Sequence, residues 1–218
     1  MRYTFKKPID IIDVRSDIVG KTYALLSAGL FLASFFSYLS LGLQIGLIGS
    51  IFLMLLSIGL IIAASKYRHT EWGLPLYFGF IAIIGFMMGP TINHYLNLPH
   101  GSSIVMKAII TTAIATTGLT VYAFKAKRSF NQLGGFLFVG LIIILVGGLA
   151  NIFFRSPIFD LVLAGMGALI FSGYILFDTS RLLSGDIDSP IVGAITLFMN
   201  ILNLFTSLLR IFSGTSND

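Results

Sequence analysis

The sequence contains no cysteine. This absence excludes disulfide bonds, zinc sites with cysteine ligands and catalysis by a thiol nucleophile. Histidine is scarce as well: none of the three histidines has a second histidine or a carboxylate four residues on, the spacing of a helical metal pair. Ser102 and Ser103 lie near His94 and His100, but no Gly-x-Ser-x-Gly turn of a serine hydrolase accompanies them. We therefore expect no enzyme activity, no cofactor and no bound metal.

Charged residues are also few, at 11% of the 218 residues, against about 25% in soluble domains. Hydrophobic residues make up 56% of the chain, and the mean hydropathy is +0.94. A soluble core could not bury so much apolar side chain, so the composition predicts a polytopic membrane protein. The uncharged runs are about 20 residues long, which favours membrane-spanning helices over the short alternating strands of a barrel.

The hydropathy pattern predicts an all-α fold with seven transmembrane helices. We place these helices at about 20–41, 44–65, 73–96, 102–124, 132–153, 158–183 and 190–212. They define a transmembrane domain over 20–212, preceded by an N-terminal tail over 1–19 and followed by a short C-terminal tail over 213–218. Within the third helix, Pro90 lacks the amide hydrogen that would bond to Phe86, so the helix is expected to bend or end there. Seven crossings place the two termini on opposite sides of the membrane.

The basic residues predict the orientation. Of the 14 Lys and Arg residues, eleven fall on the side of the N-terminus in this seven-span arrangement. They are Arg2, Lys6, Lys7, Arg15, Lys21, Lys66, Arg68, Lys125, Lys127, Arg128 and Arg181. Because Lys and Arg collect on the cytoplasmic side, the N-terminus is expected in the cytoplasm and the C-terminus on the opposite side. The net charge of +5 is thus a topology signal, and no nucleic-acid partner is expected.

The N-terminal tail has a weak amphipathic pattern. Asp10, Asp13 and Asp17 fall on one face of a helix, while Ile9 and Ile12 fall elsewhere. Two interpretations follow from this pattern. The tail either lies against the membrane surface or forms a docking site for a cytoplasmic partner.

A few polar residues interrupt the apolar spans, and such residues are expensive in hydrocarbon and often functional. Asp178 follows an uncharged run over 161–177 and lies about 8 Å inside the end of its helix, at about 1.5 Å per residue. Asn200 and Asn203 lie one turn apart on the last helix. The short connection makes the last two helices antiparallel neighbours, so Asp178 is expected to face Asn200 or Asn203. The alternative is an interfacial ion pair between Asp178 and Arg181.

Four segments carry a resemblance to a known family: ILFDTSRLLSGD at 175–186, TLFMNILNLFTSLLRIF at 196–212, GPTINHYL at 89–96 and SFNQLGGFLFVG at 129–140. In this order they resemble the Bax inhibitor motif-containing (TMBIM) family, from about residue 20 to the C-terminus. LGGFLFVG, GGLANIFF and ILFDTSRLL are most similar to its bacterial YccA branch, whose members are described as modulators of the membrane AAA+ protease FtsH.

The resemblance implies a seven-helix bundle with helix 7 central, in a bacterial inner membrane. It also implies, in some members, a pH-sensitive calcium leak controlled by one aspartate on helix 6 and one on helix 7. Asp178 matches the first aspartate, whereas Asn200 stands at the second position, so the pair of carboxylates is incomplete. We therefore expect a regulatory protein that binds an FtsH-like protease. The alternative is a calcium leak with Ca2+ as the permeant ion and Asp178, Asn200, Asn203 and Arg181 as gate or latch residues.

Overall fold

The computed structural model describes residues 8–126 and 129–215, with side chains described from residue 15 onward. This part of the chain is helical and contains no strand. The elements are α1 (Pro8–Leu39), α2 (Leu47–Lys66), α3 (Gly73–Leu96), α4 (Gly101–Lys125), the 3-10 turn η1 (Asn131–Leu133), α5 (Gly134–Phe154), α6 (Pro157–Ser184) and α7 (Pro190–Gly214). Seven of these helices are long and apolar enough to cross a membrane, as predicted.

The helix boundaries agree with the predicted ones to within three residues, except at the beginning of the chain. There α1 begins at Pro8 instead of about residue 20, so the described part of the predicted tail is a continuation of α1. Its role as a membrane-surface segment or as a docking site stays a prediction. The charged residues of this segment end the apolar run, but no residue between Pro8 and Gly20 forces the helix to end. The helix therefore extends beyond the predicted apolar span, which begins at about residue 20.

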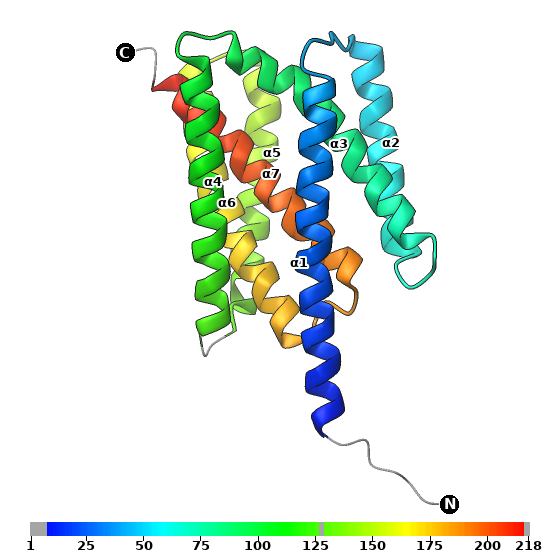
Figure 1. The fold of residues 1–218 in the computed structure, drawn as a ribbon. Coiled ribbons are helices and arrows are strands. Elements are labelled where there is room, and N and C mark those ends of the chain that lie inside the picture. The colour runs from blue at the N-terminus through cyan, green and yellow to red at the C-terminus, as the bar shows by residue number, and fades with distance from the viewer. Residues whose placement is uncertain (1–7, 127–128, 216–218) are drawn as a thin grey trace, which may run out of the picture.

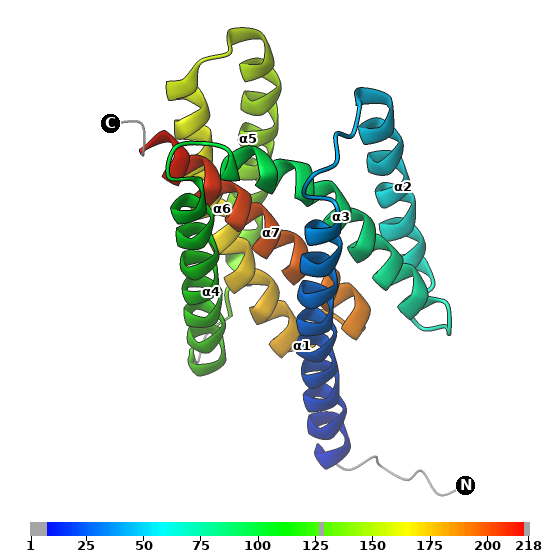
Figure 2. The ribbon, with the colours of Figure 1, turned by 45° about the horizontal axis from the view of Figure 1, so that its top comes forward.

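Helix α7 lies at the centre of the bundle. Figures 1 and 2 show it running obliquely between the other helices. In an 18-residue apolar stretch of α7, 56% of the residues are buried inside the protein, against 11–28% in the corresponding stretches of the other six spans. It packs against α1, α2, α3, α4 and α6. The predicted central position of the seventh helix is therefore confirmed.

Close packing of α3 on α1 depends on two glycines of α3. A Cβ atom at Gly85 would lie 2.6 Å from the Cα of Ala33, and one at Gly89 would lie 2.6 Å from the carbonyl oxygen of Ser37. Both distances are too short for a side chain, so the two backbones can approach this closely only with glycine there.

Helix α3 continues past Pro90 to Leu96, so this proline does not end the helix. Pro90 leaves the carbonyl of Phe86 without its usual amide donor. The hydroxyl of Ser40, the residue directly after α1, donates to that carbonyl at 2.8 Å. The turn after α1 thus supplies the missing hydrogen bond, which hydrocarbon could not do.

Helices α6 and α7 are antiparallel neighbours joined by the short connection 185–189. Gly185 has φ of 87°, a left-handed conformation that favours glycine. The amide of Asp186 donates to the carbonyl of Arg181 at 2.9 Å, as in the Schellman ending of a helix. This sharp ending turns the chain directly into α7 at Pro190 and brings Asp178 to the depth of the first half of α7.

Candidate functional site at the contact of α6 and α7

The Asp178 carboxylate of α6 accepts a hydrogen bond from the Asn200 side-chain amide of α7 at 2.8 Å. Both residues are buried, with 5% and 8% of their surface exposed. The side-chain amide of Asn200 can direct an N–H toward the carboxylate without adding charge. The bond joins the central helix to α6 inside the bundle.

Arg181 lies on the same side of α6 as Asp178. Its guanidinium is 3.6 Å from the other carboxylate oxygen of Asp178, and its side chain is 37% exposed. It also lies over the Phe177 ring, 5.4 Å from the ring centroid. Both contacts predicted for Asp178 are therefore present: a neutral donor on α7 and a cation on its own helix. A buried carboxylate needs such partners, because an unpaired charge in hydrocarbon is very costly.

Asn203 does not join this contact. Within the described part of the chain its side chain makes no hydrogen bond, while its backbone carbonyl accepts from the hydroxyls of Thr206 and Ser207. Of the two asparagines considered from the sequence, the structure brings Asn200 alone to Asp178. The role of Asp178, Asn200, Asn203 and Arg181 as a gate or latch stays a prediction.

The sequence did not mark Thr179 and Ser180, the two residues that follow Asp178, as site residues. The Thr179 hydroxyl lies 3.4 Å from the Tyr23 hydroxyl of α1. The Ser180 hydroxyl accepts from the backbone amide of Phe130, just before η1, at 3.0 Å. Consecutive helical residues point about 100° apart, so three adjacent side chains reach three different neighbours. The run DTSR at the end of an uncharged stretch was the available signal.

The end of α6 and the connection after it make polar contacts with α1 and with η1. Arg15 of α1 donates to the carbonyl of Ser184 at 2.8 Å. The carboxylate of Asp186 accepts from Ser184 and from Asn131, each at 2.7 Å, and these hydrogen bonds lower its pKa. Several connections on the side where α1 begins are therefore tied to the end of the helix that carries Asp178.

Asp188 makes a further tie on this side. Its carboxylate accepts from Arg68 of the α2–α3 connection at 3.2 Å, and this hydrogen bond is the main cause that lowers the pKa of Asp188. His69 lies 3.6 Å from the same oxygen and accepts a hydrogen bond from Arg68 at 3.1 Å. The tie joins the α2–α3 connection to the segment just before α7.

The chemistry of this site is that of one buried carboxylate between an amide and a guanidinium. Across the residues that the structure describes, no three His, Cys, Asp or Glu side chains are grouped to hold a metal ion. The amide of Asn200 is uncharged and the guanidinium of Arg181 is cationic. The arrangement can hold two helices together and present one buried carboxylate near one end of the membrane span.

Residues 15–218 match the model of a protein family described as inhibitor of apoptosis-promoting Bax1. The chain belongs to the Bax inhibitor family. The match covers all seven spans and includes Asp178 and Asn200. This Bax inhibitor family protein is a multi-pass membrane protein.

Relatives of known sequence extend the comparison. The modulator of FtsH protease YccA of Escherichia coli K12 is 31% identical over 201 residues, which cover 92% of this chain and 91% of the relative. A protein of Vibrio cholerae named as an uncharacterized membrane protein is 35% identical over 92% of this chain and 91% of its own. Mouse protein lifeguard 4 is 35% identical over 73% of this chain and 66% of its own. The predicted family and its YccA branch are confirmed.

Proposed function

We propose that this protein binds and modulates an FtsH-like AAA+ protease in a bacterial inner membrane. The observation that carries the proposal is the 31% identity with the E. coli modulator over 92% of this chain and 91% of the relative. The similarity thus spans nearly the whole of both chains, not a single shared motif. The proposal requires no catalytic residue, because the protein acts by binding.

Helix α1 supplies a surface for such a partner. Its 32 residues extend over ~48 Å at about 1.5 Å per residue, whereas the hydrocarbon core is about 30 Å thick. Figure 1 shows its first turns extending beyond the ends of the neighbouring helices. With the N-terminus in the cytoplasm, as the basic residues predict, this extension faces the cytosolic part of a membrane-bound protease. Arg15 then ties the extension to the end of α6.

The proposal is tested by co-isolation of an FtsH-like protease with the tagged full-length protein from its native membrane. A deletion of residues 2–12 shortens the extension of α1 and leaves Arg15 in place. We expect this deletion to reduce protease recovery and to slow turnover of the protein. A deletion of residues 216–218 at the other terminus is the matched control and should change neither. Unchanged recovery and turnover in the first deletion would show that α1 is not the docking element, and no protease with the intact protein would refute the proposal itself.

A calcium leak is the second candidate, and the buried carboxylate of Asp178 favours it. A carboxylate near the end of a span can attract a cation to a pathway between helices. Here, however, the partner on α7 is the neutral Asn200 amide, so two carboxylates do not share a proton at this site. We therefore propose protease modulation as the main function.

A further inference from the structure

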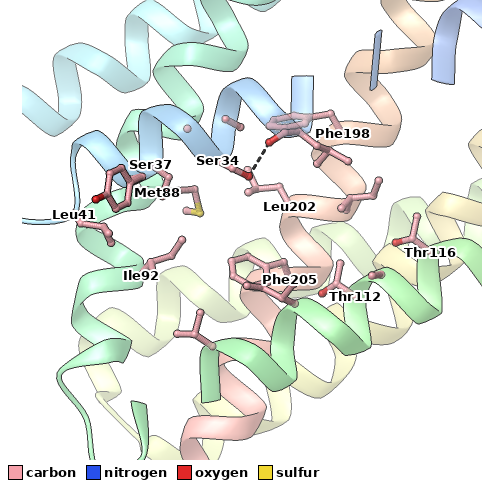
Figure 3. Close-up of a pocket in the computed structure, with 18 of the residues that line it drawn as sticks. Ser34, Ser37, Leu41, Met88, Ile92, Thr112, Thr116, Phe198, Leu202 and Phe205 are labelled. Atoms are coloured by element: carbon pink, nitrogen blue, oxygen red, sulfur yellow. Dashed lines mark hydrogen bonds between the residues drawn. The ribbon is translucent and has the colours of Figure 1, made fainter. Parts of the chain in front are cut away.

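A hollow of about 560 Å³ lies between α1, α3, α4 and α7, in the half of the bundle away from the beginning of α1. Figure 3 shows the end of α1 and the turn after it, with Ser34, Ser37 and Leu41, on one side of this hollow beside Met88 and Ile92 of α3. Thr112 and Thr116 of α4 lie on another side. Phe198, Leu202 and Phe205 of the central helix form the floor between them. We call this hollow the α1–α4 groove.

The groove opens sideways toward the membrane. Across the described residues, α1 and α4 have no pair of Cα atoms within 8 Å of each other. The two helices meet through the rings of Tyr23 and Phe124, 6.0 Å apart, nearer the end where α1 begins. Two residues that line the groove, Tyr38 and Ile109, are 73% and 49% exposed on the outer surface of the bundle. The groove is therefore continuous with the face that the bundle presents to lipid.

The walls of the groove suit hydrocarbon. None of its lining residues is charged, so nothing in it would hold an ion or a charged ligand. The hydroxyls of Ser34 and Thr112 donate to carbonyls of their own helices at 2.8 and 2.7 Å. The Thr116 hydroxyl is buried without a partner among the described residues, but a threonine in a helix can turn to a carbonyl of the preceding turn. The lining is therefore mainly apolar, with hydroxyls as its polar groups.

The groove is too small to enclose a whole helix. One helical turn with its side chains is about 10–12 Å across and 5.4 Å long, which is a cylinder of roughly 500 Å³. The volume of the groove is about that of a single turn. The lining residues of the surrounding helices extend over several turns, so a helix of that length would not fit inside. A narrow flexible chain can follow its length.

We propose that the α1–α4 groove binds one hydrocarbon chain of a membrane lipid, taken from the leaflet on the side where α3 ends and α4 begins. Bilayer lipid is the medium on which the opening faces, and it fills apolar space between spans that water cannot enter. The chain would lie against the floor of α7 and stabilise the contact of α7 with α1 and α4. The site is separate from Asp178 and does not depend on protease binding.

The test uses the full-length protein in vesicles of phosphatidylethanolamine and phosphatidylglycerol whose acyl chains carry a photoreactive diazirine. After irradiation, labelled positions are mapped by mass spectrometry. We expect adducts on the floor residues Ile201, Leu202 and Phe205, because a lipid chain reaches the central helix there by entering the groove. Absence of adducts on these residues in the unmodified protein would overturn the proposal.

Matched variants separate a bound chain from ordinary contact with lipid. Ala113 lines the groove, whereas Ile114 beside it is 69% exposed and lies outside the lining. Ala113→Trp should abolish the adducts on α7, and Ile114→Trp should leave them unchanged. Thr117→Trp, also in the lining, is the second blocking variant if Ala113→Trp does not fold. Adducts on α7 that persist in a folded blocking variant would refute a chain in the groove.

A second measurement tests for water in place of lipid. The chain has no native cysteine, so Ala113→Cys places a single thiol in the groove. A charged, water-soluble thiol reagent should leave this cysteine unmodified in vesicles and modify it after unfolding in denaturing detergent. Rapid modification in intact vesicles would show an aqueous vestibule and would contradict the proposal.

Discussion

At the scale of single residues, the run DTSR explains how one turn of α6 holds three neighbours. Asp178 bonds to α7, Thr179 approaches α1 and Ser180 accepts from the chain before η1. Their hydrogen bonds take the place of hydrogen bonds to water, which the hydrocarbon excludes. A buried polar group left without a partner would cost about 1–3 kcal/mol. The polar residues of this turn are therefore connections between elements as well as candidate gate residues.

Removing the amide partner of Asp178 should weaken the bundle. We expect Asn200→Leu to lower the free energy of unfolding by about 1–3 kcal/mol, because Asp178 then remains buried with one donor fewer. Thermal unfolding in detergent measures the effect. Asn203→Leu is the matched control, since the Asn203 side chain makes no hydrogen bond with described residues, and it should cost clearly less. Equal losses in the two variants would contradict a special role for the Asp178–Asn200 bond.

Supplying the second carboxylate should create a response to pH. In Asn200→Asp two carboxylates would face each other and share a proton, so we expect a calcium leak whose rate changes between about pH 6 and 8. Vesicles with a trapped calcium dye report the flux. The double variant Asp178→Asn, Asn200→Asp should lose the response to pH. A strong pH-dependent leak of the unmodified protein that Asp178→Asn abolishes would favour the channel over the protease modulator.

At the scale of elements, the connections on the side where α1 begins are linked around the end of α6. Arg15 binds the carbonyl of Ser184, Asn131 binds Asp186, and Arg68 binds Asp188. These ties join α1, η1 and the α2–α3 connection to one short segment. A partner that moves the beginning of α1 would therefore act directly on the helix that carries Asp178.

The tie between Arg68 and Asp188 should depend on pH. Its hydrogen bond lowers the pKa of Asp188 in the folded protein, so its contribution is present above the unfolded pKa of about 3.9 and is lost as pH falls through the folded pKa. Asp188→Asn should thus reduce the unfolding temperature slightly near neutral pH and have no effect once Asp188 is protonated. The effect should be small, because Asp188 is 62% exposed. Unfolding temperatures across this pH range measure it, and a difference that grows at acidic pH would contradict the assignment.

At the scale of the whole molecule, seven spans place the beginning of α1 and the end of α7 at opposite ends of the bundle (Figure 1). The positive-inside rule then predicts that the α2–α3, α4–α5 and α6–α7 connections are cytoplasmic. Reporter enzymes fused after Lys127 and after Asp218 test this orientation. We expect a cytoplasmic signal from the first fusion and an external signal from the second. Two signals on the same side would contradict seven crossings.

Composition and hydropathy determined the fold class and the number of spans. They placed the helix ends to within three residues except at the start of α1, because the cost of charge in hydrocarbon acts along the chain and is visible in the sequence. The same cost marked Asp178 as a candidate site residue. The start of α1 was predicted about twelve residues too late, since charge ends an apolar run without ending a helix.

Tertiary structure decided which side chains meet. It brought Asn200 and not Asn203 to Asp178, matched the Ser40 hydroxyl to the carbonyl freed by Pro90, and left the α1–α4 groove open beside the central helix. These outcomes depend on the rotation and spacing of helices that are far apart in sequence. Apolar residues facing lipid and apolar residues facing α7 look alike in a membrane protein, so hydropathy carries no signal for that arrangement.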